Sequence, residues 1–156
     1  MFATSLFAWF LAMQGAGDAD THIFGAPDCP FEAAFPAPFI RSRLPDGGAL
    51  ATQRARNANR SALCSTSFRS PDATTPCQDV YRISSRIEAP LPDSDGRWLI
   101  AETTLCVREI EAISETKRRT RFLIAAAGDW VFIIEEVHAQ AGLDSVQFRY
   151  RDRTEE

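Results

Sequence analysis

One stretch decides the fold of this chain: residues 119–139, which are RTRFLIAAAGDWVFIIEEVHA. Apolar and β-branched residues fill both halves, which predicts two strands, residues 119–127 and 130–139, joined by a tight Gly-Asp turn. In the second strand both faces stay apolar as far as Ile134. We therefore expect this strand to lie in the centre of a sheet.

Three further segments show the alternation of apolar and polar residues that is typical of strands. They are residues 80–88, 98–111 and 146–151. Prolines, aspartates and a glycine separate the first two segments, which indicates a turn-rich connection. With the hairpin, the sequence predicts five antiparallel strands in chain order.

The N-terminal half has a different composition. Residues 20–78 contain seven prolines, a density that excludes long helices and central strands. Residues 48–63 lack proline and are rich in Ala and Arg, so they are compatible with a helix that has a thin apolar face. The prolines are Pro27, Pro30, Pro36, Pro38, Pro45, Pro71 and Pro76.

These patterns predict a single mainly β domain, or an α+β domain if the helix forms. We expect a curved antiparallel five-stranded meander in residues 79–152, covered by the Pro-rich arm of residues 20–78, with a solvated tail at 153–156. The alternative is a small lipocalin-like barrel with one more strand in the arm.

The N-terminus has the pattern of a secretory signal. Residues 2–13 are apolar, and residues 14–19 are small or polar, as at a cleavage site. No Lys or Arg precedes the apolar run, so a buried N-terminal helix is the alternative. The run is shorter than the roughly 20 residues of a membrane span, so we do not expect an integral membrane protein. Residues 1–19 as a signal predict export, and the excess of Arg and Ala is typical of a GC-rich bacterial genome. We therefore expect a periplasmic or secreted protein.

The chain has four cysteines, Cys29, Cys64, Cys77 and Cys106, without a C-x-x-C pair. With only two histidines in the chain, this set does not predict a zinc site or a redox dithiol. An exported protein would form two disulfides, each worth about 2–4 kcal/mol. We favour a disulfide between Cys64 and Cys77, because the polar loop between them gains most from a cross-link. Cys29 would then pair with Cys106, and sequence alone leaves the other pairings open.

Few residues point to catalysis. The formal net charge of -4 does not predict nucleic-acid binding, and the chain has no G-x-S-x-G, H-E-x-x-H or phosphate-binding loop, so we expect no cofactor or metal. The candidates for catalysis are Glu136 and His138 on one face of the strand, with Glu102 facing them in one register. A His between carboxylates could act as a general acid or base. The alternative, which we favour, is a solvated strand end.

A basic run, KRRTR at residues 117–121, is the candidate binding surface. Arg118, Arg119 and Arg121 could contact an acidic partner, a phosphate or an anionic lipid surface. In the alternative interpretation, the acidic residues of the preceding strand neutralise these arginines across the hairpin.

Residues 128–133, GDWVFI, resemble the Gly-Asp-Trp strand that opens the last hairpin of many SnoaL-like domains. Those domains place a His a few residues after the Trp, where this chain has Glu136, and they begin with helices that prolines would interrupt here. The resemblance covers this strand alone and implies at most a cone-shaped sheet.

Three functions remain compatible with the sequence. The first is an exported envelope or secreted accessory domain that binds a protein or an apolar small molecule. The second is a structural component of a surface assembly. The third is a small hydrolase or isomerase that uses His138 with a carboxylate. We favour a binding protein over an enzyme, because no catalytic motif accompanies the His.

Overall fold

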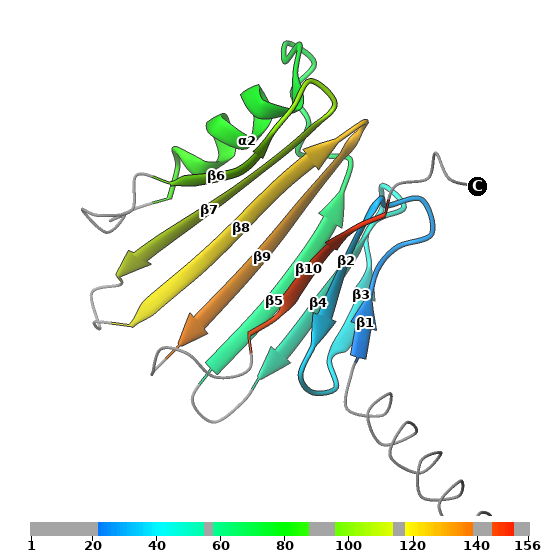
Figure 1. Ribbon diagram of the computed structural model, residues 1–156. Coiled ribbons are helices and arrows are strands. Elements are labelled where there is room, and N and C mark those ends of the chain that lie inside the picture. Colours follow the sequence, from blue (N-terminus) through cyan, green and yellow to red (C-terminus); the bar gives the residue numbers. More distant parts are fainter. Residues whose placement is uncertain (1–21, 55–57, 88–95, 114–117, 139–144, 152–156) are drawn as a thin grey trace, which may run out of the picture.

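The computed structural model describes residues 22–54, 58–87, 96–113, 118–138 and 145–151 (Figure 1). The predicted signal at residues 1–19 and the tail at residues 153–156 lie outside this part of the chain. The elements in chain order are β1 (His22–Phe24), β2 (Phe31–Phe35), β3 (Ile40–Arg43), β4 (Ala49–Arg54), β5 (Ala58–Ser65), α2 (Pro76–Ser84), β6 (Arg97–Ala101), β7 (Leu105–Ile113), β8 (Arg119–Ala127), β9 (Trp130–His138) and β10 (Gln147–Tyr150).

The strands form two antiparallel sheets. The large sheet has seven strands in the order β3-β4-β5-β9-β8-β7-β6, and the small sheet has three in the order β1-β2-β10. The small sheet lies across the β3–β5 side of one face of the large sheet, while α2 packs over β7 and β8 on the other face (Figure 1). We call the first the inner face and the second the outer face.

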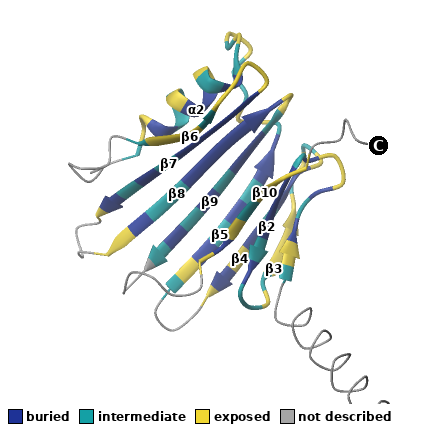
Figure 2. Cartoon of the chain, in the orientation of Figure 1, coloured by how far each residue is buried: buried dark blue, intermediate teal, exposed yellow. Residues whose placement is uncertain are grey.

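The hairpin predicted from residues 119–139 is confirmed. β8 and β9 pair from Ala127 opposite Trp130 to Arg119 opposite His138. Gly128 in the turn has a φ of 58°, a left-handed conformation that favours glycine. β9 lies fourth of the seven strands, and side chains on both of its faces are buried (Figure 2).

The prediction of a mainly β fold is confirmed, but the five-stranded meander and the barrel alternative are wrong. β6 to β9 do follow one another as a meander. The strand β5, from the proline-rich half, then takes the place beside β9, and β10 joins the small sheet instead. The end strands β3 and β6 do not pair with each other, so the described sheet is not closed.

The predicted arm and its helix over residues 48–63 are also wrong. The arm supplies five strands, and residues 48–63 hold most of the β4–β5 hairpin, with Ala51 opposite Ala62. Every second residue is buried along β4 and from Arg60 to Cys64 of β5, and the small side chains Ala49, Ala51 and Ala62 lie under the phenylalanines of the small sheet. Alanine at alternate positions permits a strand despite its helical propensity.

The strand predicted over residues 80–88 is wrong as well, because α2 occupies its first half. Thr75 caps the helix by accepting a hydrogen bond from the Gln78 N–H, and Pro76 stands in the first turn, where proline is tolerated. Val80, Ile83 and Ile87 follow helical spacing and pack on the outer face, whereas only Ile83 and Ile87 also fit the alternation of a strand.

The disulfides join Cys29 to Cys64 and Cys77 to Cys106, so the favoured pairing of Cys64 with Cys77 is wrong. Strand alternation explains the difference. Cys64 points to the inner face of β5, where the loop between β1 and β2 brings Cys29. Cys106 points to the outer face of β7, beneath Cys77 of α2. The pairing of Cys29 with Cys106 would have to cross the large sheet.

Two disulfides indicate an oxidising, extracytoplasmic compartment. They also fix the layers, since one links the small sheet to β5 and the other links α2 to β7. Within the described residues, no helix has the length and apolar character needed to cross a membrane.

Candidate functional site

Polar side chains cross the inner face at one end of the large sheet. Register places Gln53 opposite Arg60, Arg60 opposite Glu136, and Glu136 opposite Arg121. Glu109 of β7 extends the series, because Arg121 Nε lies 3.0 Å from Glu109 Oε2. We call these five residues the polar row. Each lies two positions from a residue of the inner core, so strand alternation turns its side chain inward.

Glu136 is the fully buried centre of the polar row. Its Oε1 accepts hydrogen bonds of 2.8 Å from Arg121 Nη1 and 2.8 Å from the Val146 N–H. The carboxylate thus joins β8 and β9 of the large sheet to the residue that precedes β10 of the small sheet. The structure brings together two residues that the sequence singled out, Glu136 and Arg121, and the geometry suits a structural ion pair rather than a base open to substrate.

The other catalytic candidates do not gather around Glu136. His138 ends β9, opposite Ala58 and Arg119, and its side chain lies outside the described part of the structure. Glu102 lies at the opposite end of the sheet, where its N–H donates to the Leu105 carbonyl. The register that would bring Glu102 to Glu136 is therefore wrong, because β7 pairs with β8 so that Leu105 faces Ala127.

The basic run sits at the start of β8 and faces acidic residues of β7. Arg119 Nε lies 3.6 Å from Glu111 Oε2, and Arg121 bonds to Glu109 as described. Arg118 is exposed. These ion pairs are those of the alternative interpretation, and a role of the three arginines in binding an acidic partner stays a prediction.

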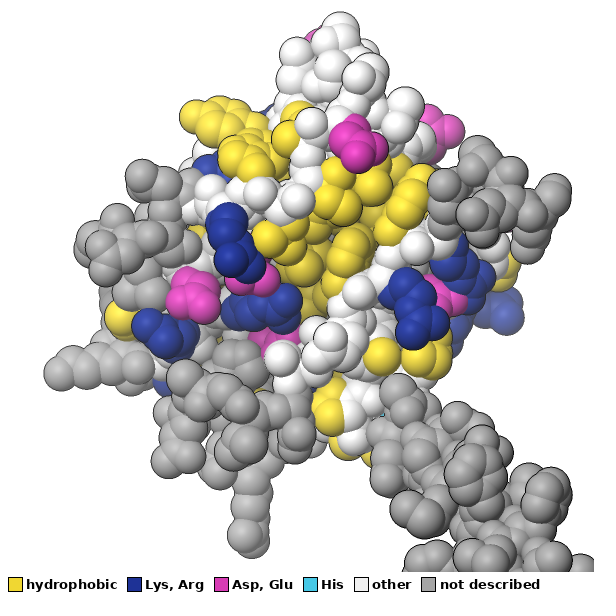
Figure 3. Space-filling model, viewed as in Figure 1, with side chains coloured by type: hydrophobic (Ala, Val, Ile, Leu, Met, Phe, Trp, Pro, Cys, Tyr) yellow, Lys and Arg dark blue, Asp and Glu magenta, His cyan; other side chains and the backbone are white. Residues whose placement is uncertain are grey.

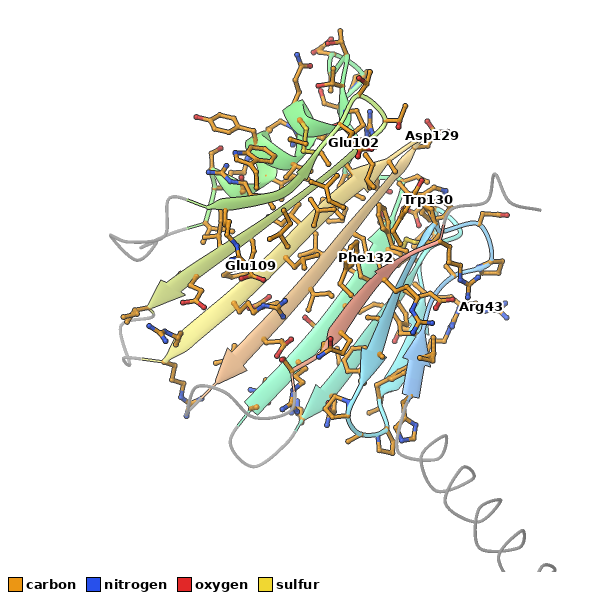
Figure 4. The ribbon with its side chains drawn as sticks, viewed as in Figure 1. Arg43, Glu102, Glu109, Asp129, Trp130 and Phe132 are labelled. Atoms are coloured by element: carbon orange, nitrogen blue, oxygen red, sulfur yellow. A yellow bond between two sulfur atoms is a disulfide. The ribbon has the colours of Figure 1, made fainter. Side chains whose placement is uncertain are left out.

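Between β6 and β10 no strand of the small sheet lies over the inner face, although Val107, Ala125 and Phe132 are fully buried among their neighbours there (Figure 1). Four residues are neighbours across adjacent strands of this face: Ile100, Val107, Ala125 and Phe132. The Phe148 ring of β10 lies 6.0 Å from the Phe132 ring. Figure 3 shows hydrophobic side chains gathered in this region between charged groups, and Figure 4 shows Trp130 and Phe132 on it. We define the inner-face opening by its half-buried or exposed apolar side chains, Ile100, Trp130, Phe148 and Tyr150.

Two exposed carboxylates stand at one end of this opening. Glu102 follows β6 and Asp129 precedes β9, and Figure 4 shows both toward the same end of the large sheet as Trp130. Neither carboxylate makes a hydrogen bond or an ion pair with a described residue, whereas Glu109 at the other end is paired with Arg121. The opening therefore has an apolar middle and, at one end, two carboxylates that form no ion pair within the described residues.

A cation–aromatic stack on the outer face was not predicted. The Arg108 guanidinium lies 4.8 Å from the Trp98 ring and 5.5 Å from the Tyr81 ring, and its Nη1 donates to Ser84 Oγ at 2.8 Å. Gly96, with a φ of 82°, passes so close that an added Cβ would collide with the guanidinium. The stack fixes α2 on β7. Sequence reasoning missed it because residues 80–88 were expected to form a strand.

Two aspartates outside the polar row hold loops. Asp79 is fully buried and pairs with Arg69 Nε at 2.6 Å and Arg82 Nη2 at 3.1 Å. Asp46 accepts hydrogen bonds from the Ser65 hydroxyl and from the N–H groups of Gly48 and Ser67, among others. The Ser65 hydroxyl is the largest of the influences that hold the pKa of Asp46 well below its usual range. Both carboxylates serve local structure.

A shallow groove of about 220 Å³ lies on the outer face of β4, β5 and β9. Alternation turns the side chains of Gln53 and Arg60 to the other face, so the groove presents mainly hydroxyl and amide groups, one arginine and Glu135. Among the described residues, no group of His, Cys, Asp and Glu is arranged to hold a metal ion.

Comparison with known proteins gives no assignment: no family model matches the chain, and no curated protein matches its sequence.

Proposed function

We propose that this protein is an exported, non-catalytic binding domain that contacts a partner protein through the inner-face opening. The observation that carries the proposal is the contrast among its aromatic side chains. Phe24, Phe31, Phe35 and Phe132 are fully buried between the sheets, whereas three aromatic residues gather at the opening, with Trp130 and Phe148 half-buried and Tyr150 37% exposed. Aromatic groups left partly exposed at the margin of an apolar core are typical of protein-binding surfaces.

The same packing favours a protein partner over an enclosed small molecule. A small apolar ligand needs a cavity that buries most of its surface, and the phenylalanines fill the space between the two sheets. The opening instead presents a face bordered by the acidic pair Glu102 and Asp129. Catalysis is disfavoured because Glu136 is fully buried and committed to Arg121 and the Val146 N–H.

Co-purification from the extracytoplasmic fraction of the producing cell tests the proposal. Tyr150→Asp places a charge in the opening, and Phe68→Asp places the same charge at an aromatic residue of matched exposure, 40%, in a loop elsewhere. We expect one protein to co-purify with the wild type and with Phe68→Asp, and to be lost at least about tenfold with Tyr150→Asp. Equal recovery with both variants, or no co-purifying protein with any form, would refute the proposal.

A further inference from the structure

The strand β10 has one paired edge and one unpaired edge. Gln147 lies opposite Ala34 and Arg149 opposite Glu32, and the Arg151 N–H donates to the Pro30 carbonyl at 2.7 Å. In an antiparallel pair, residues that exchange hydrogen bonds alternate with residues that do not. The odd-numbered residues of β10 therefore bond to β2, and Phe148 and Tyr150 direct their N–H and C=O groups away from it.

These outward groups have no partner within the described chain. β10 pairs with β2 alone, and no backbone hydrogen bond joins Phe148 or Tyr150 to another described residue. The preceding outward donor, the Val146 N–H, is satisfied by Glu136 Oε1. Glu136 thus caps the beginning of the edge, and the outward N–H and C=O groups of Phe148 and Tyr150 remain without a hydrogen-bond partner among the described residues. An unpaired edge of this kind is a template for another strand.

The edge borders the inner-face opening. The bond from Val146 to Glu136 and the contact of Phe148 with Phe132 place β10 above β9 and antiparallel to it, so that Tyr150 lies toward Trp130. Figure 1 shows β10 as the edge of the small sheet that faces β9 and β8. A strand added to β10 would lie over the opening.

The edges of the large sheet carry features that oppose such pairing. A bulge between Trp98 and Ile100 interrupts β6. The edge strand β3 carries Arg41 and Arg43, both exposed, between two prolines that flank the strand. Bulges, edge charges and prolines all discourage strand addition. β10 pairs in regular register with β2 and places aromatic side chains beside its free edge.

From this geometry we infer that the partner binds as an extended polypeptide segment that adds to β10 as an antiparallel fourth strand of the small sheet. The inference rests on the proposed function and names its mode of binding. Antiparallel pairing is the arrangement of every strand pair among the described residues and is slightly the more stable per residue. The added strand bonds to the open groups of Phe148 and Tyr150.

The opening also sets the chemistry of this segment. Residues that pair with Phe148 and Tyr150 share their face, so they point to the inner face and are apolar, while the intervening residues face solvent and are polar. At the Trp130 end the segment passes Glu102 and Asp129, which lack ion pairs within the described residues, and a basic residue there is complementary in charge.

Amide exchange of the full oxidised chain tests the inference with a synthetic peptide that begins with lysine and alternates valine with threonine. We expect the peptide to slow exchange at the Phe148 and Tyr150 amides at least about tenfold and to leave unchanged the Arg41 amide of β3, which also faces away from its partner strand. A peptide N-methylated on its valines cannot donate hydrogen bonds to β10, so it should not protect the Phe148 and Tyr150 amides. A peptide N-methylated on its threonines should protect like the parent, because those N–H groups face away.

Three results would overturn the inference: no protection at Phe148 and Tyr150, equal protection by both methylated peptides, or protection in the concentrated protein without peptide, which would make a second copy the occupant. Co-purification tests the proposed function separately. A partner that is lost with Tyr150→Asp, together with unprotected β10 amides, would refute strand addition and leave the binding function standing.

Discussion

Removing the charge of Glu136 should destabilise the protein more than removing any exposed carboxylate of the same sheet. In Glu136→Gln the side chain keeps its shape and one acceptor oxygen for the Val146 N–H, but Arg121 loses a fully buried ionic partner at 2.8 Å. Removing one partner from a buried pair costs about 3–5 kcal/mol. Arg121 retains Glu109, and the amide still accepts a hydrogen bond, so we expect a loss of roughly 2–3 kcal/mol.

Urea unfolding of the oxidised protein measures this loss, with Glu111→Gln as the matched control. Glu111 pairs with Arg119 across the same two strands, but its side chain is 37% exposed, so its removal should cost less than about 1 kcal/mol. The Val146 amide should also exchange faster in Glu136→Gln. Equal losses for the two variants would show that the buried carboxylate does not link the two sheets as the structure indicates.

Three other predictions follow from the packing. Asp46→Asn should destabilise the protein at neutral pH, and its difference in unfolding free energy from the wild type should shrink below about pH 4. The reason is that a carboxylate with a lowered pKa stabilises the fold above its unfolded pKa and loses this effect on protonation. A pH-independent difference in urea unfolding would contradict this. Gly96→Ala should cost more than Gly47→Ala in the same assay, since both glycines have a positive φ but only a Cβ on Gly96 meets Arg108; equal costs would refute the close contact. Dithiothreitol should reduce the Cys77–Cys106 disulfide before the Cys29–Cys64 disulfide, because only the first contains a half-exposed cysteine, Cys77. Alkylation followed by mass spectrometry measures the order of reduction, and the reverse order would be inconsistent with this burial.

The parts of the fold that follow from sequence are those with strong local signals. The β8–β9 hairpin combines two apolar strands with a Gly-Asp turn, and its partners are adjacent in the chain. The strand predicted over residues 98–111 is close to correct in type, although Glu102 and the two residues after it divide it into β6 and β7.

The remaining elements depended on tertiary context or on a missed local signal. In residues 80–88 the apolar positions fit both a strand and a helix, and the Thr75–Pro76 cap that decides for the helix was available in the sequence. The β4–β5 hairpin is strand only because its alanines lie under phenylalanines of another sheet. No local sequence signal indicates that β10 pairs in the small sheet rather than continuing the meander.

The candidate site was predictable to the same limited extent. Glu136 and Arg121 lie on adjacent strands of one hairpin, so their proximity follows from the hairpin itself. Gln53 and Arg60 of the polar row could not be found, since their strands were assigned to a proline-rich arm. The open edge of β10 depends on how strands are distributed between two sheets, and so does the disulfide pairing.

The disulfide pairing is therefore the most direct test of the layered arrangement and of the extracytoplasmic compartment. The measurement is peptide mapping, without reduction, of the protein isolated from the cell that produces it. We expect cross-linked peptides that join Cys29 to Cys64 and Cys77 to Cys106. Peptides that join Cys64 to Cys77 would contradict the assignment of the faces of the large sheet, and four free thiols would contradict the oxidising compartment.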